Sequence, residues 1–124
     1  MPGKAALVLL VHGSRDPAWM GPFEQLCEDL AKNASKKVVR IACLQFCSPD
    51  LLEVVSGLSE EGVESVLIVP VFISGKGHVL KDVPEAVKAA SGRCPGMDIR
   101  VTEALGEFPE VARAFRDALL GLLR

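Results

Sequence analysis

Two unbroken apolar runs place the strongest constraint on how this chain can fold. One covers residues 6–11 and the other residues 66–73, and both are built from Val, Leu, Ile and other apolar residues. An unbroken apolar strand needs cover on both faces, which is typical of a parallel sheet between two helical layers. Each run leads into a glycine-containing loop, and these loops carry the only two histidines of the sequence, His12 and His78. We expect that the two loops form the active site.

The overall composition agrees with a sheet that is buried on both faces. Of the 124 residues, 49% are hydrophobic and only 5% are aromatic. This length predicts a single domain over residues 1–124. The net charge of -2 gives no reason to expect a nucleic-acid partner, and no apolar run reaches the length of a membrane span. Residues 1–4 lead directly into the first run, so we expect no signal peptide and a cytoplasmic location.

Strand patterns recur along the chain and alternate with helix patterns. The expected strands cover residues 4–11, 36–45, 65–73 and 97–104. The last is the least apolar, which favours an edge position. Pro70 cannot donate to a central ladder, so we expect a bulge or an early loss of pairing there.

The helix patterns have recognisable starts. A first helix ends near Asn33, with its start obscured by Gly21 and Pro22. A second is expected to begin with Ser48 as its cap and Pro49 in its first turn, and to end at Gly62. A capping box at residues 82–85 opens a third helix that ends near Ala90. A fourth opens at residues 108–109, and its expected inner face is Val111, Phe115, Leu119 and Leu122.

Alternating strands and helices in one small domain predict an α/β, flavodoxin-like three-layer fold. Right-handed crossovers then favour a four-stranded parallel sheet in the order 2-1-3-4, with helices on both faces. Strands 1 and 3 become neighbours, and the chain leaves them in opposite directions. The crevice at the carboxyl ends of these two strands is a topological switch point, and folds of this class bind ligands there. His12 and His78 are expected on the two sides of that crevice.

Two histidines at a switch point suggest a metal site or an acid/base pair, whereas the simpler interpretation is two loop histidines without a role. Neither an ATP-binding loop nor a dinucleotide fingerprint is present. Arg15, Lys76 and Lys81 lie near the expected crevice. They are either ordinary surface charges or a set that suits a substrate with several carboxylates.

The four cysteines show no metal or redox spacing. Cys27, Cys43, Cys47 and Cys94 contain no C-x-x-C pair, so we expect them to be buried small hydrophobes. Cys43 and Cys47 lie close to the expected site, and contact of Cys47 with a metal remains a secondary hypothesis.

The two loops resemble those of the small sirohydrochlorin chelatases of the CbiX type. The first loop reads H-G-S-R at residues 12–15, and the second segment reads V-P-V-F-I-S-G-K-G-H-V-L-K-D-V-P at residues 69–84. The resemblance implies a chelatase-like fold and insertion of Co²⁺, or of Fe²⁺ or Ni²⁺, into sirohydrochlorin without a nucleotide. It implies that His12 and His78 ligate the metal, that one lobe pairs with another in a homodimer, and that both loops contact the tetrapyrrole. The expected substrate contacts are Ser14, Arg15, Gln45, Ser74, Gly75, Lys76 and Gly77.

The chain departs from the pattern of this family at three positions. Val11 replaces a common Gly, Gln45 a common Glu, and Phe108 a common His. The last two changes remove groups that can move protons, and Glu103 or Glu107 is the expected substitute. The alternative function is a non-enzymatic metal or tetrapyrrole carrier on the same fold. A flavodoxin-like nucleotide-binding module is disfavoured, because the phosphate loop is absent.

Overall fold

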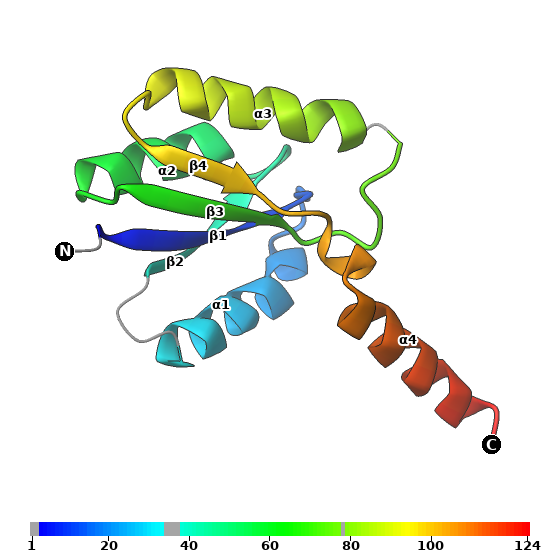
Figure 1. Ribbon diagram of the computed structural model, residues 1–124. Coiled ribbons are helices and arrows are strands. Elements are labelled where there is room, and N and C mark those ends of the chain that lie inside the picture. The colour runs from blue at the N-terminus through cyan, green and yellow to red at the C-terminus, as the bar shows by residue number, and fades with distance from the viewer. Residues whose placement is uncertain (1–2, 34–37, 78) are drawn as a thin grey trace.

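The computed structural model describes residues 3–33, 38–77 and 79–124. Its centre is a four-stranded parallel sheet in the order β2-β1-β3-β4 (Figure 1). This confirms the predicted order 2-1-3-4. The strands are β1 (Ala5–Val11), β2 (Val38–Cys43), β3 (Ser65–Pro70) and β4 (Asp98–Val101).

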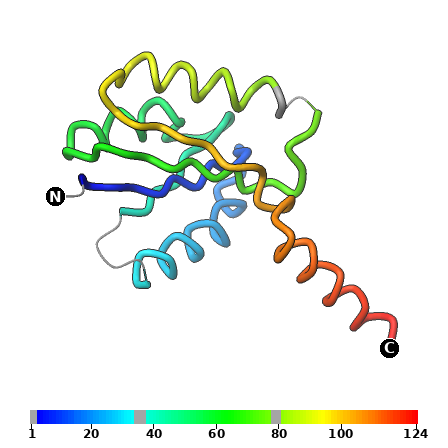
Figure 2. The backbone as a smooth tube through the Cα atoms, in the orientation of Figure 1, coloured from blue at the N-terminus to red at the C-terminus, as the bar shows by residue number. Residues whose placement is uncertain are grey.

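Helices cover the two faces of the sheet unequally. The helices α2 (Leu51–Glu60) and α3 (Val79–Arg93) pack together on one face. The helix α1 (Gly21–Asn33) packs against β2 on the other face, whereas α4 (Pro109–Leu122) runs away from the body of the molecule (Figures 1 and 2). Two short 3-10 helices, η1 (Pro17–Met20) and η2 (Leu105–Glu107), precede α1 and α4. Within the described residues, no helix is long and apolar enough to cross a membrane.

The main core lies between the sheet and the α2–α3 layer. Val8, Leu10 and Ile68 point into it from the strands and are fully buried. Leu51, Val55 and Leu58 fill it from α2. The alternate side chains of β1, such as Leu9 and Val11, are buried on the opposite face. Burial on both faces explains the unbroken apolar run, since each such side chain contributes roughly 1.5–3 kcal/mol when covered.

The predicted start of the second helix was wrong. The helix begins at Leu51, and its cap is Asp50 rather than Ser48. The Asp50 carboxylate accepts a hydrogen bond from the Glu53 N–H at 2.9 Å, and the Glu53 carboxylate accepts one from the Asp50 N–H at 3.2 Å. This reciprocal capping box satisfies two helix-end donors at once, so it outcompetes a single serine cap. Pro49 instead follows a cis peptide bond in the turn before the helix.

The strands are shorter than the sequence pattern predicted. The strand β2 ends at Cys43, and β3 ends at Pro70 rather than at residue 73. Early loss of strand pairing at Pro70 is therefore confirmed. Just after the strand, the Val71 N–H donates a hydrogen bond to the Leu10 carbonyl of β1 at 2.8 Å. The short strand β4 forms an edge, as predicted. Residues 36 and 37 of the predicted second strand lie outside the described part.

The third helix is longer than predicted at both ends. It starts at Val79, before the expected capping box, and continues to Arg93. Pro84 consequently lies inside the helix, where it removes one hydrogen-bond donor. Val83 and Ala90 are buried against the core, and this packing holds the helix together despite the proline.

The predicted inner face of the fourth helix was also wrong. The helix opens at Pro109 with Phe108 as its cap residue, as expected. However, the exposed fractions of Phe115, Leu119 and Leu122 are 48%, 62% and 80%. Periodicity identified the apolar face correctly, but within the described structure this face does not pack against the sheet of the same chain, because α4 packs mainly on η2.

Candidate active site

The first site loop follows β1 at the carboxyl edge of the sheet. The Leu44 N–H donates to the Val11 carbonyl at 2.8 Å, and the Gln45 N–H donates to the His12 carbonyl at 3.1 Å. Gly13 has φ of 106°, and a side chain there would collide with the Gln45 carbonyl oxygen. Only glycine allows this close approach without strain. The loop is therefore held directly against residues 44–47.

His12 lies half-buried between an amide and two aromatic rings. The Nε2 atom of Gln45 is 3.4 Å from the Nε2 atom of His12. The ring centroids of Phe72 and Phe46 are 6.1 and 6.4 Å from that of His12. An amide N–H that donates to this nitrogen needs its lone pair, which is also what a metal ion would need. Gln45 thus lies beside one of the two imidazole nitrogens that can coordinate a metal.

Phe46 is a site residue that the sequence analysis missed. Its φ of 69° lies in the left-handed region, and 52% of the residue is exposed. The guanidinium carbon of Arg15 lies 5.1 Å from the centre of its ring, within the range of a cation–π contact. Backbone strain at a bulky residue is often kept for function. Here it places a flat aromatic surface beside His12.

A disulfide closes the segment that carries Gln45 and Phe46. Cys43 and Cys47 are bonded to each other, so the expectation that they serve only as buried small hydrophobes was wrong. In this form neither sulfur is a thiolate, and the hypothesis that Cys47 contacts a metal as a free thiolate does not hold. Sequence spacing did not reveal the pair, because the turn at residues 44–46 is what brings the two close. Cys27 and Cys94 are free, and only Cys94 is fully buried.

The second site loop follows β3 and is held by η2, which follows the neighbouring strand β4. The Gly75 N–H donates to the Glu107 carboxylate at 3.2 Å, and the Lys76 N–H donates to the Ser74 hydroxyl at 3.2 Å. Gly77 has φ of 83° at the end of the loop. His78 lies outside the described residues, so its position opposite His12 stays a prediction. Among the described residues, no three His, Cys, Asp or Glu side chains gather into a metal-binding group.

The remaining predicted contacts lie around this edge. A pocket of about 260 Å³ lies between the second loop, β4 and α3, and Gly75, Glu103 and Glu107 line it. The Ser14 hydroxyl accepts a hydrogen bond from the Asp16 N–H at 3.1 Å. The cationic residues Arg15, Lys76 and Lys81 are exposed, each on a different segment. The structure therefore brings Gln45 to His12 and Glu107 to Gly75.

Variants of Glu107 can show whether its carboxylate positions the second site loop or transfers a proton. Glu107→Ala removes the acceptor of the Gly75 N–H, and we expect the metal-insertion rate that the resemblance implies to fall by about 10-fold with an unchanged melting temperature. Glu107→Gln keeps an acceptor oxygen and should restore most of the rate if Glu107 positions the loop. Equal losses in both variants would instead assign proton transfer to Glu107. Glu60→Gln, an exposed carboxylate at the end of α2, is the matched control.

Comparison with known proteins finds one matching family and several relatives with the same printed name. The CbiX family model matches residues 6–121. The sirohydrochlorin cobaltochelatase of Methanopyrus kandleri is 31% identical over 80 residues, which are 64% of this chain and 56% of that protein. The sirohydrochlorin cobaltochelatase of Methanosarcina barkeri is 29% identical over 99 residues, 80% of this chain and 76% of that protein. The match thus spans little more than half the length of the first relative.

Solved structures show the same fold. A cobalamin biosynthesis CbiX protein from Marinobacter aquaeolei superposes with a TM-score of 0.82 at 31% identity, and the match covers 96% of this chain and 97% of that one. The sirohydrochlorin chelatase SirB from Bacillus subtilis, in complex with cobalt, superposes with a TM-score of 0.81 at 23% identity. That match covers 95% of this chain but only 50% of SirB, and at this identity it concerns the fold.

Proposed function

Because the chain belongs to the CbiX family, we propose that it inserts a divalent metal into sirohydrochlorin or a similar tetrapyrrole, without ATP. Co²⁺ is the proposed metal, with Fe²⁺ and Ni²⁺ as alternatives. The observation that carries the proposal is the position of His12. The imidazole stands at the end of β1, at the switch point beside β3, and is flanked by Phe46 and Phe72. A half-buried imidazole beside aromatic surface suits a metal and a flat macrocycle.

The chemistry of imidazole fits metal transfer. Imidazole binds Co²⁺, Fe²⁺ and Ni²⁺ well, and two ligands, His12 and His78, leave coordination positions open for the incoming ring nitrogens. When M²⁺ enters the ring, the two pyrrole N–H protons leave. A neutral histidine can accept such a proton near neutral pH. Gln45 would have to give up its contact with the His12 Nε2 atom when that atom takes the metal.

The substrate would be held by the polar groups of both loops. Ser14, Gln45, Ser74, Gly75 and Gly77 are the proposed hydrogen-bonding contacts. Sirohydrochlorin is proposed to bind through its carboxylates to the cations Arg15, Lys76 and Lys81.

Neutralising these cations provides a direct check on carboxylate binding. Arg15→Gln, Lys76→Gln and Lys81→Gln should each raise KM by about 3- to 10-fold while kcat changes little. The increase should shrink at high salt, because exposed charges are screened. Arg93→Gln, an exposed cation at the far end of α3, is the control and should leave KM unchanged. Unchanged KM in all three test variants would show that these residues are ordinary surface charges that do not bind the substrate.

We propose that the working unit is a cytoplasmic homodimer. A single domain of this size leaves the site at the edge of the sheet exposed and cannot enclose a macrocycle. Larger members of the family that the chain resembles carry two such domains, which face each other. That this chain covers half of SirB supports the same arrangement in two copies. Sedimentation at micromolar concentration should show a dimer, and a monomer would contradict the proposal.

The alternative is a metal or tetrapyrrole carrier without turnover. The observation that favours it is the loss of two proton-transfer groups at Gln45 and Phe108. The deciding experiment incubates the protein anaerobically with sirohydrochlorin and each metal in turn, and follows the absorbance of the metallated product. Product far in excess of protein supports the chelatase. Binding of metal or pigment without such excess supports the carrier.

A further inference from the structure

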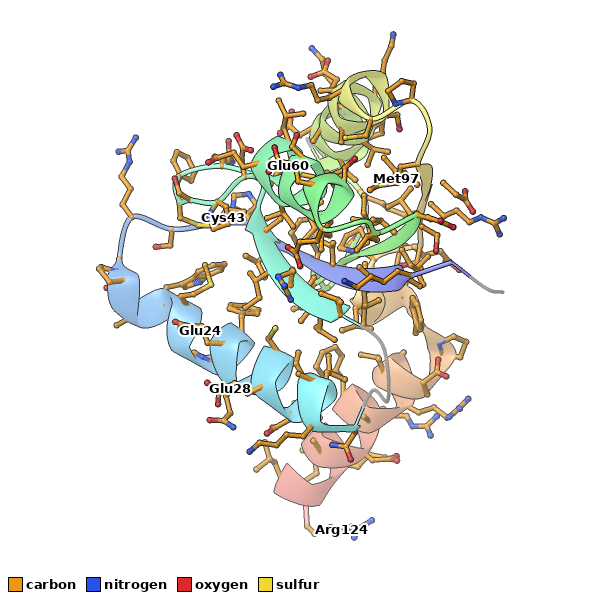
Figure 3. All side chains as sticks on the ribbon, turned by 90° about the vertical axis from the view of Figure 1, so that its left-hand side faces the viewer. Glu24, Glu28, Cys43, Glu60, Met97 and Arg124 are labelled. Carbon is orange, nitrogen blue, oxygen red and sulfur yellow. A yellow bond between two sulfur atoms is a disulfide. The ribbon has the colours of Figure 1, made fainter. Side chains whose placement is uncertain are left out.

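The disulfide between Cys43 and Cys47 closes the turn that carries Phe46. The two cysteines are four positions apart in the sequence, and their Cα atoms are 5.7 Å apart (Figure 3). Between them stands Phe46, whose ring lies beside His12 and Arg15. A bond that reduction can open therefore lies next to the exposed ring of the candidate site.

Phe46 holds a backbone conformation that is costly for a bulky residue. Its φ of 69° lies in the left-handed region, and within the described residues no other non-glycine residue has a positive φ. Such a conformation persists only where the surrounding structure enforces it. The disulfide enforces it covalently, because it fixes both ends of the turn around Phe46.

Backbone hydrogen bonds hold the flanks of this turn without the help of the disulfide. The N–H groups of residues 44 and 45 donate to the carbonyls at the end of β1 and of His12, at 2.8 and 3.1 Å. The Cys43 N–H donates to the Pro49 carbonyl at 2.8 Å. In the part of the chain that the structure describes, no backbone hydrogen bond involves residues 46–48. Opening the disulfide therefore releases residues 46–48, while His12 keeps its place at the end of β1.

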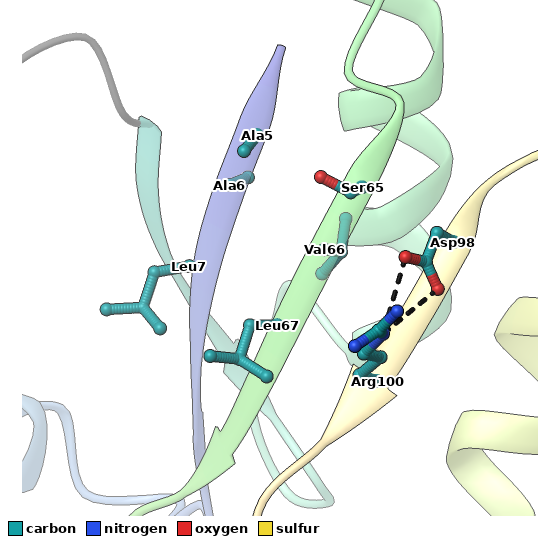
Figure 4. Close-up of a pocket in the computed structure, with 8 residues that line it drawn as sticks. All are labelled: Ala5, Ala6, Leu7, Ser65, Val66, Leu67, Asp98 and Arg100. Atoms are coloured by element: carbon teal, nitrogen blue, oxygen red, sulfur yellow. Dashed lines mark hydrogen bonds and ion pairs between the residues drawn. The ribbon is translucent and has the colours of Figure 1, made fainter. Parts of the chain in front are cut away.

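A hollow of about 300 Å³ beside the turn leaves room for this movement. Its lining consists of Met20, Glu24, Ile41, Cys43, Ser48 and Pro49. A larger hollow of about 370 Å³ lies over β1, β3 and β4, and its polar edge is the ion pair of Asp98 and Arg100 (Figure 4). No sulfur atom is found in the described lining of the larger hollow. Of the two, only the smaller hollow borders a group that can be oxidised and reduced.

We propose that the Cys43–Cys47 pair is a redox-modification site that sets the position of the Phe46 ring. With the disulfide formed, the ring stands beside His12 as a flat surface. With the disulfide reduced, Phe46 returns to the right-handed or extended region, and its ring leaves His12. The inference deepens the proposed function and rests on it for the ligand, since the oxidised form is the one that holds the flat macrocycle. In the cytoplasm, the location proposed above, disulfides are usually transient and redox-sensing.

The reductant is a dithiol, and the more exposed sulfur receives its attack. Cys47 is partly exposed, whereas the exposed fraction of Cys43 is 1%. A thiolate of the dithiol attacks the Cys47 Sγ atom, the S–S bond breaks, and the Cys43 sulfur leaves as a thiolate that takes up a proton. The second thiol of the reductant loses its proton and attacks the mixed disulfide. This step closes the reductant's own disulfide and releases Cys47, which is protonated in turn. Two electrons and two protons thus pass from the dithiol to the cysteine pair.

Thiol counting gives the first test. After denaturation, the air-exposed chain should show two thiols, those of Cys27 and Cys94, and four after treatment of the folded protein with dithiothreitol. In the folded, reduced protein, iodoacetamide should modify Cys47 first, because burial raises the pKa of the Cys27 thiol and Cys94 is buried. Four thiols in the air-exposed chain would overturn the proposal, and so would a disulfide that resists dithiothreitol in the folded protein.

The NMR signals of the His12 ring report the position of Phe46 without any ligand. The chain has two histidines, so His12→Ala assigns the signals. Reduction should shift the His12 ring protons, because the ring current of Phe46 acts on them only while the ring is close. The double variant Cys43→Ala/Cys47→Ala should show the reduced signals from the start and should not respond to dithiothreitol. In Phe46→Leu, reduction should leave the His12 signals nearly unchanged. Equal His12 signals in both redox states of the native chain would overturn the proposal.

Binding of metal-free sirohydrochlorin, followed by absorbance, tests the consequence for the ligand. Reduction should raise the Kd of the native chain by about 10-fold, within the usual range of coupling between two sites. Phe46→Leu should raise the Kd of the oxidised chain by a similar factor, because the aromatic surface is lost. Reduction of Phe46→Leu should then add little, since both changes act through the same ring. Equal weakening on reduction in the native chain and in Phe46→Leu would overturn the role of Phe46.

These outcomes separate the redox site from the proposed function. His12 signals that respond to reduction, in a chain that binds no tetrapyrrole, would refute the proposed substrate alone. Signals and binding that ignore the redox state, in a chain that inserts metal, would refute the redox site alone.

Discussion

His78→Ala is expected to abolish metal insertion, whereas His12→Ala should retain part of it at high metal concentration. His12 is anchored at the end of a central strand by backbone hydrogen bonds to residues 44 and 45. His78 follows the glycine-containing segment of the second loop, which suits a ligand that moves with the metal. We therefore expect kcat to fall at least 100-fold in His78→Ala. In His12→Ala, the metal concentration at half-maximal rate should rise by 10- to 100-fold.

Steady-state insertion measured against Co²⁺ concentration distinguishes the two roles. Calorimetric titration with Co²⁺ alone should show weaker binding in both variants, and an unchanged melting temperature would exclude a purely structural loss. Lys88→Ala, on the exposed part of α3, serves as a folding and handling control. A near-normal kcat in His78→Ala would show that His78 is not the proton acceptor, and Glu103 and Glu107 would be the next candidates.

The topology was predictable because it depends on strong and local signals. The unbroken apolar runs of β1 and β3 require two covered faces, and right-handed crossovers then leave few possible orders. The switch point between these strands follows from that order alone. The sequence alone therefore predicts His12 at the carboxyl edge of the sheet.

Other features depend on contacts that periodicity does not report. The pairing of Cys43 with Cys47, and the exposure of Phe46 beside His12, both follow from one turn with a left-handed residue. A residue with φ near 69° carries no sequence signal when it is a phenylalanine. The start of α2 was missed because two capping signals, Ser48 and Asp50, lie two residues apart and compete.

The apolar face of α4 shows a different limit. Its spacing correctly identified Phe115, Leu119 and Leu122 as one stripe. An amphipathic pattern states that a face needs cover, but it does not state which body provides the cover. A partner molecule can provide that cover as well as the chain's own sheet can.

The second large effect is expected from Gly13→Ala. An L-residue at φ of 106° costs on the order of 1–3 kcal/mol, and its Cβ would overlap the Gln45 carbonyl oxygen. The loop must then move away from residues 44–47, which displaces His12 from its position at the carboxyl end of β1. We expect the free energy of unfolding to fall by about 2–4 kcal/mol and the Co²⁺ affinity to fall at least 10-fold.

Thermal unfolding and Co²⁺ titration measure these two effects on the same sample. Gly57→Ala is the matched control, because its Cβ would meet nothing within 4 Å inside the helix α2. Alanine favours a helix interior over glycine by about 1 kcal/mol, so this variant should melt slightly higher and bind Co²⁺ normally. If Gly13→Ala keeps the native melting temperature and the native Co²⁺ affinity, the first site loop does not approach residues 44–47 as closely as described. A lower Co²⁺ affinity with a native melting temperature would show that the substitution displaces His12 without destabilising the fold.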